Sequence, residues 1–293
     1  ISPNSATFLC SLKACSSIGD IERGRAIQSD IPVEIFRRDT SLGNSLIDMY
    51  AKCGALHEAQ QVFQQLPIRN IISWNALLAG YTEHGFGDDA LDQLAKMHLE
   101  GMSPDASTLN CCLKACGIIG SLVQSQEIHD VIVMKGLENA NFIGNTLVDV
   151  YTKCGLLAEA QYIFNELSVR TVVSWTALIT GYAQLGESES VFLILNQMLE
   201  KGMKPNFVTF VNILNVCSHA GLVRKGQEYF ELLGINDYGI VYTPEHYSCM
   251  VDLFARAGHI SMAIELIKKM PFHPSIRFWL SVLGACRKWR NVE

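Results

Sequence analysis

Apolar residues recur along the chain with the spacing of short amphipathic helices, and the helices come in pairs. In the stretch 40–70, Leu46 and Tyr50 lie on one helical face. Gly54 follows where a left-handed C-terminal cap would be needed, a second apolar run continues, and Pro67 ends it. This pattern predicts a helical hairpin closed by a tight turn.

The hairpin pattern is repeated. Residues 43–81 return as residues 144–182, an offset of 101 positions, and the two copies are identical at 21 of 39 positions. Such self-similarity indicates an array of small units rather than one globular core. Unit lengths cycle through 35, 31 and 35 residues, and extra residues fall within 232–244. The predicted units are 5–39, 40–70, 71–105, 106–140, 141–171, 172–206, 207–243 and 244–275, after the end of a preceding unit at 1–4.

A helix pair cannot bury both of its faces alone, so neighbouring pairs must stack into an all-α solenoid. The first unit, 5–39, is expected to hold two helices. The last stretch, 276–293, is expected to start a further unit as one helix whose partner is missing. Its apolar face includes Phe278, Trp279 and Leu283, together with Val282. We expect this end to be the least stable part of the array.

Composition narrows the choice of function. The residues are 49 % hydrophobic and 18 % charged, which is enough apolar surface for a folded chain. No apolar run approaches about 20 residues, so no membrane partner is expected. The net charge of −6 argues against general polyanion binding, and any nucleic-acid binding must be local. The chain opens at Ile1 rather than Met and is interpreted as an excised segment.

Seven of the ten cysteines recur at the repeat spacing, as in Cys15, Cys116 and Cys217. We interpret them as reduced thiols that fill equivalent packing positions, with redox pairing as the alternative. No C-x-x-C occurs, which a zinc deaminase needs, and there is no P-loop, G-x-G-x-x-G or G-x-S-x-G. We therefore expect no catalytic residue, metal or cofactor in this segment.

The motifs SWNALLAGY, LIDMYAKCG, LKAC, GMSPD and EHYSCMVDL decide among helical-hairpin families. Tetratricopeptide repeats keep to 34 residues with a W-x2-L-G-x2-Y opening, which this chain lacks. Over essentially its whole length the chain resembles plant pentatricopeptide repeat proteins of the PLS class, which alternates long, short and standard repeats. FWLSVLGACR is similar to the start of the E extension motif of that class. The resemblance implies a right-handed α-solenoid.

The resemblance also implies that one repeat reads one RNA base, through the fifth and the last residue of the repeat. Carried over by position, the base-recognition pairs are Asn44/Asn70, Asn75/Asp105, Asn145/Thr171, Thr176/Asn206 and Ser248/Ser275, and weaker pairs are Leu9/Asp39, Asn110/Ala140 and Val211/Thr243. Second-position residues that would sandwich bases are Ile72, Phe142 and Val173, and Lys52, Lys153 and Arg256 are placed to meet phosphates.

Simpler interpretations exist for each of these residues. Asn44 and Asn145 could be helix caps, and Asp105 and Asn206 could be turn residues. Ile72 and Val173 could belong to the core, and Lys52 and Lys153 could be solvated surface cations. Two tryptophans, Trp74 and Trp175, lie on the apolar stripe and are expected in the core.

Hydrogen-bonding chemistry gives the pairs a base preference. Ionised Asp only accepts, which suits the ring N–H of uracil, whereas Asn also donates and suits cytosine or adenine. Asn75/Asp105 is therefore expected to read U, Asn44/Asn70 a pyrimidine with C favoured, and Thr176/Asn206 A. Asn145/Thr171 keeps a pyrimidine-type fifth residue with a weak choice.

The resemblance points to a specificity factor for organellar C-to-U RNA editing, in a mitochondrion or chloroplast. Its implied partners are single-stranded organellar RNA, small editing-factor proteins and a deaminase-domain protein, with the chain itself monomeric. One alternative is a protein-binding helical scaffold. Another is an RNA-binding array that serves RNA cleavage, splicing or stability.

Overall fold

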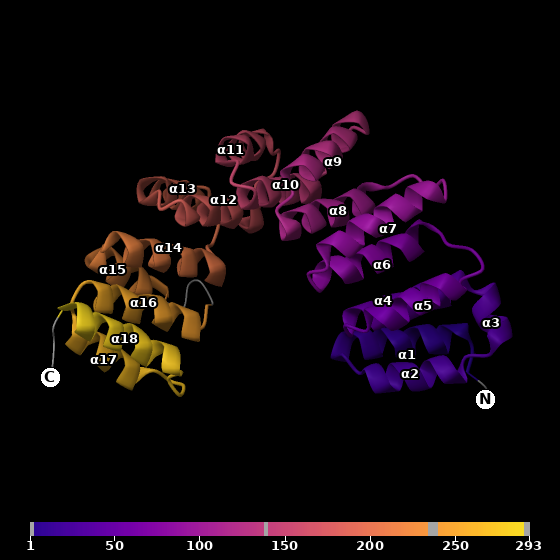
Figure 1. Cartoon of the computed structure of the whole chain (residues 1–293), viewed down its shortest axis with the longest axis horizontal. Coiled ribbons are helices and arrows are strands. Elements are labelled where there is room, and N and C mark those ends of the chain that lie inside the picture. The colour runs from indigo at the N-terminus through magenta and orange to yellow at the C-terminus, as the bar shows by residue number, and fades with distance from the viewer. Residues whose placement is uncertain (1–2, 138–139, 234–239, 290–293) are drawn as a thin grey trace. The chain divides into compact units, whose positions relative to one another are not determined.

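The structure, a computed structural model, describes residues 3–137, 140–233 and 240–289. Every regular element in these ranges is a helix (Figure 1). The chain divides into two compact units, Ile1–Cys154 and Gly155–Glu293, called unit 1 and unit 2 below. None of the helices described is both long and apolar enough to cross a membrane.

Unit 1 is built from antiparallel helix pairs that stack side by side (Figure 1). The helices that open the pairs, called row helices below, pack successively against one another, and the first four of them each pack against a partner helix that follows in the chain. The row helices of unit 1 are α1 (Ser5–Ile18), α4 (Thr40–Lys52), α6 (Ile71–Glu83), α8 (Ala106–Ile119) and α10 (Asn141–Lys153). The partner helices are α2 (Ile21–Asp30), α5 (Leu56–Gln65), α7 (Gly87–Leu99) and α9 (Leu122–Met134).

Unit 2 follows the same plan. Its row helices are α12 (Val172–Gln184), α14 (Phe207–Ala220), α16 (Pro244–Arg256) and α18 (Ile276–Trp289). The partner helices are α13 (Ser188–Glu200), α15 (Val223–Leu233) and α17 (Ile260–Lys269), and α11 (Leu157–Glu166) packs on α12. The expected site of the extra residues, 232–244, includes residues 234–239, which lie outside the described ranges.

The core runs along the row helices, as the apolar periodicity predicts. Trp74 is 1 % exposed and meets Phe63 edge to face, with ring centroids 4.6 Å apart. Trp175 and Phe164 repeat this contact at the same centroid distance, 4.6 Å. Both tryptophans are therefore core residues and not stacking platforms. Gly54 has φ 77°, the predicted left-handed cap, so a residue with a side chain would be strained there.

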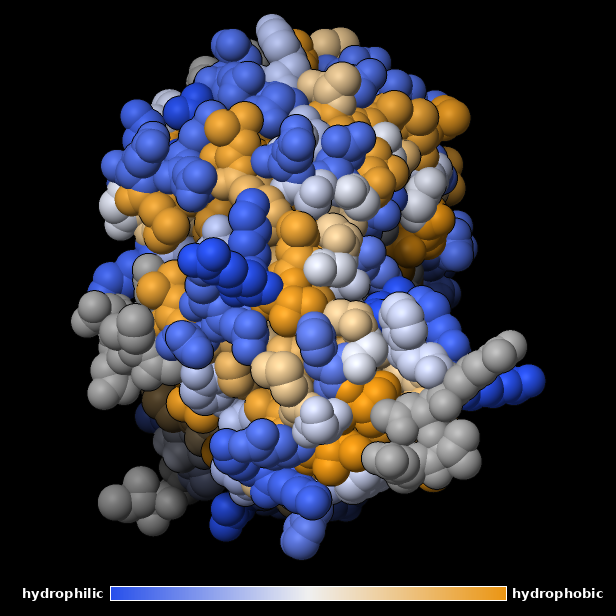
Figure 2. All heavy atoms as spheres, turned by 90° about the vertical axis from the view of Figure 1, so that its left-hand side faces the viewer, coloured by the Kyte–Doolittle hydropathy of each residue, from blue (hydrophilic) through white to orange (hydrophobic). Residues whose placement is uncertain are grey.

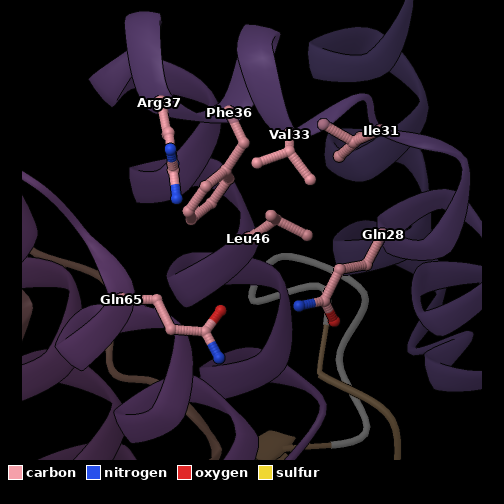
Figure 3. A pocket seen from close by; sticks show the side chains of 7 residues that line it. All are labelled: Gln28, Ile31, Val33, Phe36, Arg37, Leu46 and Gln65. Carbon is pink, nitrogen blue, oxygen red and sulfur yellow. The ribbon is translucent and has the colours of Figure 1, made fainter.

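Residues 5–39 contain three helices, so the expectation of two was wrong. The additional helix, α3 (Val33–Arg38), begins after Pro32, which has no backbone N–H to leave unpaired at a helix start. Helix α3 forms one wall of a hollow of about 370 Å³ lined by Gln28, Ile31, Val33, Phe36, Arg37, Leu46 and Gln65. Figure 3 shows Phe36 and Arg37 reaching from α3 toward the side chain of Gln65.

The apolar face of α18 is only partly covered by neighbouring helices. Phe278 and Val282 are buried, and α18 packs on α16 and α17. Trp279 and Leu283, by contrast, stay 39 % and 63 % exposed. Figure 2 shows a face of the molecule on which hydrophobic patches alternate with hydrophilic side chains. The low stability expected at this end of the array remains a prediction.

All ten cysteines are free thiols, and most of them are buried or half-buried. Burial raises the pKa of Cys116 and of Cys217 to about 11, and that of Cys249 to about 12. Thiols with such pKa values are almost wholly protonated near neutral pH and therefore poor nucleophiles. The packing role predicted from their repeat spacing fits these surroundings.

Candidate nucleic-acid interface

The predicted base-recognition residues gather where the row helices begin. Each fifth residue lies in the first turns of a row helix, and each last residue directly precedes the next row helix. Because α4, α6 and α8 pack side by side, the pairs of unit 1 share one edge of that unit. The same holds for α12, α14 and α16 in unit 2.

Asn75 and Asp105 form a hydrogen-bonded pair at the start of α8. Asn75 Nδ2 donates to Asp105 Oδ1 and Oδ2 at 3.1 and 3.2 Å. Asp105 caps α8 by accepting the backbone N–H of Thr108 at 2.8 Å. Partial burial acts to raise the pKa of the Asp105 carboxyl, but the hydrogen bonds from Thr108 and Asn75 outweigh it and lower that pKa. Asp105 is exposed, so an ionised acceptor faces solvent beside an amide donor.

Asn44 and Asn70 form the equivalent pair one repeat earlier. Asn44 Nδ2 donates to Asn70 Oδ1 at 3.3 Å, and the same oxygen accepts the backbone N–H of Ser73 at 3.0 Å. With its oxygen engaged twice, Asn70 has its own amide hydrogens left to donate. Asn44 is buried and is not a cap, whereas Asn70 caps α6.

Thr176 and Asn206 are linked through a third residue. Thr176 Oγ1 lies 2.8 Å from Thr209 Oγ1, and the backbone N–H of Thr209 donates to Asn206 Oδ1 at 2.9 Å. Asn206, like Asp105, is thus an extended N-cap residue of a row helix and not a turn residue. A cap fixes the side chain in place and leaves part of it available to a ligand.

The weaker pairs of unit 1 have a different arrangement. Leu9 has no polar group to offer, and Asp39 caps α4. Asn110 Oδ1 accepts from Thr146 Oγ1 at 2.7 Å, and Ala140 offers it no side-chain partner. These pairs provide no donor and acceptor side by side, as the sequence suggested.

Three pairs involve unit 2 residues other than Thr176 and Asn206. Cys249 Sγ lies 3.9 Å from the carbonyl oxygen of Val211, while Thr243 contacts a histidine described below. Both Ser248 and Ser275 are exposed, and neither hydroxyl has a hydrogen-bond partner among the described residues. Asn145 belongs to unit 1 and Thr171 to unit 2, so their pairing stays a prediction.

The second residues of α6, α10 and α12 are exposed hydrophobic side chains. Ile72 and Val173 are each 59 % exposed, and Phe142 is 48 % exposed. The core reading of Ile72 and Val173 is therefore wrong. Ile72 precedes Asn75 by three residues, which places both on the same side of α6. An apolar side chain beside each base-recognition pair, called a reading pair below, can contact the face of a base.

The three cations placed near phosphates are engaged in ion pairs. Each pairs with an aspartate four residues earlier on its own helix, and the side chains are about half exposed, where such pairs contribute little. The distances are 2.9 Å for Lys52–Asp48, 2.7 Å for Lys153–Asp149 and 2.6 Å for Arg256–Asp252. A phosphate would have to compete with these carboxylates for the three cations. Together with the net charge of −6, this indicates that phosphate contacts contribute little to any RNA affinity of the chain.

The sequence reading missed a set of hydroxyl residues at the third position of row helices. Ser73, Thr108 and Thr209 are fully buried, and each contacts both the last residue before its helix and the fifth residue of the preceding row helix. The signal in the sequence was a Ser or Thr three positions after each capping residue, the spacing of a capping box. Ser174 on α12 has that spacing too, and its Oγ accepts the N–H of Thr171 at 3.0 Å.

Histidine replaces the hydroxyl residue at the third position of α16. The backbone N–H of Thr243 donates to His246 Nδ1 at 3.2 Å, and His246 Nε2 lies 3.2 Å from the carbonyl oxygen of Phe207. Since Nδ1 accepts, the neutral ring carries its hydrogen on Nε2 and donates it to Phe207. Complete burial lowers the pKa of His246, against the opposing effects of the Phe207 carbonyl and the Glu245 charge.

We expect His246 to make the stability of the folded chain fall in mild acid. The unfolded chain takes up a proton on this histidine near its ordinary pKa of about 6.5, while the folded chain resists until lower pH. The stabilisation is therefore present above about pH 6.5 and declines as the pH falls through the depressed folded value. Urea midpoints at several pH values should show a weaker pH dependence for His246→Gln than for the unsubstituted chain. His259→Gln is the control variant, because it removes a histidine that is exposed rather than buried.

One H-x-E sequence, the spacing found in zinc deaminases, has its glutamate engaged in an ion pair. His98 and Glu100 have the H-x-E spacing, but Glu100 pairs with Arg69 at 2.6 Å. The described part of the chain contains no group of three or more His, Cys, Asp or Glu residues arranged to hold a metal ion.

Comparisons with known proteins agree with the repeat organisation. A model described as a PPR repeat matches residues 44–71, 145–171 and 245–273. A second model, described as a PPR repeat family, matches residues 69–117 and 170–219.

Similar proteins of Arabidopsis thaliana carry the same family name. One putative pentatricopeptide repeat-containing protein is 39 % identical over 282 residues, which cover 96 % of this chain and 38 % of the relative. Another, named as mitochondrial, is 33 % identical over 293 residues, covering all of this chain and 47 % of the relative. A third, named as chloroplastic/mitochondrial, is 36 % identical over 298 residues, covering all of this chain and 46 % of the relative. The chain spans less than half the length of each of these three relatives.

Among solved structures, the fold is similar to that of the pentatricopeptide repeat protein PPR10 in complex with an 18-nt psaJ RNA element. The TM-score is 0.83 at 17 % identity, over 99 % of this chain and 43 % of PPR10. This likeness confirms the predicted all-α solenoid fold. With its paired helices, its capped row helices and repeat models matching more than half its length, the chain belongs to the pentatricopeptide repeat family.

Proposed function

We propose that this chain binds single-stranded RNA in a sequence-specific manner, one base per repeat. The observation that carries the proposal is the pair formed by Asn75 and Asp105, a donor and an ionised acceptor held 3.1 Å apart at the exposed start of a row helix. A base edge needs such an arrangement of neighbouring donors and acceptors. PPR10, which shares the fold, was solved with an RNA element bound.

The exposed second residues support the same role. Ile72 and Val173 have no place in the core, and each stands at the start of a row helix near a reading pair. Apolar contact with base faces supplies affinity that does not depend on sequence. The net charge of −6 and the ion-paired cations predict modest affinity with a weak dependence on salt.

Beyond RNA binding, the alternation of long, short and standard repeats supports assignment to the PLS class. We place the chain in a mitochondrion or chloroplast, as the specificity part of a factor for C-to-U editing. A deaminase-domain protein and small editing-factor proteins would complete the activity. Several relatives carry mitochondrial or chloroplastic names, which supports the organellar location.

Fluorescence anisotropy with short RNAs tests the proposal. The target RNA carries, from 5′ to 3′, pyrimidine, U, any base, pyrimidine and A, in the order of the pairs from Asn44 to Thr176. The competitor is the same RNA with U and A exchanged, at the same salt concentration. We expect the target to bind more tightly than the competitor. Equal binding of both RNAs, or no binding of either at low salt, would contradict sequence-specific recognition by this chain.

A further inference from the structure

We infer that the buried hydroxyl at the third position of α6, α8 and α14 is a positioning residue for base recognition. It holds the fifth residue of the preceding row helix in the orientation that faces the base. The residues concerned are Ser73, Thr108 and Thr209. As a specificity role, the inference rests on the proposed RNA-binding function, but the positioning itself can be measured without RNA.

The contacts place each hydroxyl between the two members of a reading pair. Thr108 Oγ1 lies 2.6 Å from Asn75 Oδ1 and 3.0 Å from Asp105 Oδ1. Ser73 Oγ lies 2.6 Å from Asn44 Oδ1 in the same way. For Ser73, Thr108 and Thr209 alike, the hydroxyl oxygen lies closer to the fifth residue of the pair than to the last residue.

Proton counting fixes the direction of these bonds at Thr108. A hydroxyl has one hydrogen to donate, and Thr108 Oγ1 also accepts the backbone N–H of Asp105 at 3.3 Å. The carbonyl oxygen of the Asn75 amide can only accept, so the short contact is a hydroxyl donating to that oxygen. The amide nitrogen of Asn75 must then face Asp105, to which it donates. The hydroxyl and the carboxylate therefore anchor opposite ends of one amide.

A reversed amide is excluded while both anchors are present. Reversal would set the Asn75 oxygen against the ionised Asp105 carboxylate, two acceptors without a hydrogen between them. Without the hydroxyl, the amide keeps one anchor and its oxygen has lost a buried donor. We expect its orientation to broaden and its discrimination between bases to fall.

The hydroxyl follows the polar pairs Asn44/Asn70, Asn75/Asp105 and Thr176/Asn206, whereas the pair Ser248/Ser275 is followed by Phe278 at the third position of α18. The third residues of α4 and α10 are Leu42 and Ile143, and the pairs next to them, Leu9/Asp39 and Asn110/Ala140, are the weak ones. A cap alone does not require this distribution, because Asp39 caps α4 without a hydroxyl at the third position.

The chain provides a matched control for capping. Thr7 is the third residue of α1, and its Oγ1 lies 3.0 Å from Oδ1 of the capping residue Asn4. It is exposed and contacts no fifth residue among those described. Thr7→Val and Thr108→Val thus remove the same group from the same helical position, but only the second removes the contact to a reading pair.

The first experiment needs no RNA. NMR spectra of the full chain should show that Thr108→Val shifts the side-chain amide signals of Asn75. The pKa of the Asp105 carboxyl should also rise, because a less well oriented Asn75 amide donates less well to that carboxylate. Thr7→Val should move neither, and Thr108→Ser, which keeps the hydroxyl, should behave as the unsubstituted chain. Unchanged Asn75 signals and an unchanged Asp105 pKa in Thr108→Val would overturn the positioning role.

The second experiment measures the affinity ratio for RNAs with U or C at the Asn75 position. Thr108→Val should lower this ratio about three- to tenfold, with the ratio kept in Thr108→Ser and Thr7→Val. A uniform loss for both RNAs would show a structural role only and would overturn the specificity claim. If the unsubstituted chain binds no RNA, the proposed function fails, and with it the specificity claim, while the NMR result still decides the positioning.

Discussion

Asp105→Asn is expected to change the base preferred at the Asn75 position from U to C. The carboxylate of Asp105 is ionised and only accepts, so it suits the ring N–H of uracil. An amide at the same place has hydrogens to donate, and the unprotonated ring nitrogen of cytosine can accept one. A hydrogen bond to a charged group contributes about 1.5–3 kcal/mol, so affinity for the U-containing RNA should fall roughly ten- to a hundredfold.

Asp105→Asn should disturb the fold little, because another pair of this chain already has asparagine at both positions. Asn44 and Asn70 show how two asparagines pair here, with the capping oxygen accepting both the amide at 3.3 Å and a backbone N–H at 3.0 Å. Asparagine and aspartate are about equally good helix caps, so α8 should keep its start. The change therefore alters readout far more than folding.

Asn206→Asp is the matched experiment in unit 2. Asn206 caps α14 as Asp105 caps α8, and its pair with Thr176 is predicted to read A. The aspartate should shift that preference toward G, whose ring N–H needs an acceptor. Competition anisotropy with RNAs that differ at one base measures both changes. Variants that bind all single-base RNAs in the original order would contradict readout by the last residue.

Local spacing predicted the repeat and the cap at Gly54. The Gly54 turn, the hairpin pattern and the row helix stripe with Trp74 all follow from apolar periodicity and turn chemistry within one unit. Helix α3 was not predicted, because six residues are too few to show a helical period. Its surroundings, and the hollow it lines, depend on α4 and α5, which follow later in the chain.

The reading pairs were predicted by position, but their hydrogen bonds were not. Ser73 and Asn44 are 29 residues apart, and no rule of local spacing joins them. Only the packing of α4 on α6 brings the hydroxyl to the amide. The ion pairs of Lys52 and Lys153 are a different case, since an aspartate four residues earlier on the same helix is visible in the sequence. These two ion pairs can therefore be predicted from the sequence alone.

Gly80→Ala is expected to destabilise unit 1, although alanine favours helices. Gly80 lies on α6 where it packs on α4, and an added Cβ would stand 2.6 Å from Ala51 Cβ and 3.2 Å from Leu56 Cδ2. Ala51 has no flexible side chain to move aside, so the two helices would have to separate. Overpacking of this kind costs about 1–3 kcal/mol, which exceeds or offsets the roughly 1 kcal/mol that alanine gains in a helix.

Gly284→Ala is the control for this prediction. Gly284 lies within α18, and a Cβ added there meets nothing within 4 Å. That substitution should be neutral or stabilise by roughly 0.4–1 kcal/mol, since it reduces the freedom of the unfolded chain. Urea unfolding followed by the helical circular dichroism signal should move the two midpoints in opposite directions, or move only that of Gly80→Ala. Equal midpoints for the two variants would show that α4 and α6 are not tightly packed.

Gly80→Ala should also affect base recognition, because it changes the packing of the row helices. The Asn44–Ser73 contact of 2.6 Å bridges α4 and α6, so separating these helices should stretch it. The Asn75–Asp105 pair bridges α6 and α8 and does not depend on that interface. Gly80→Ala should therefore weaken base discrimination at the Asn44 position more than at the Asn75 position. Because each pair spans two neighbouring row helices, the spacing of those helices sets the geometry in which a base is read.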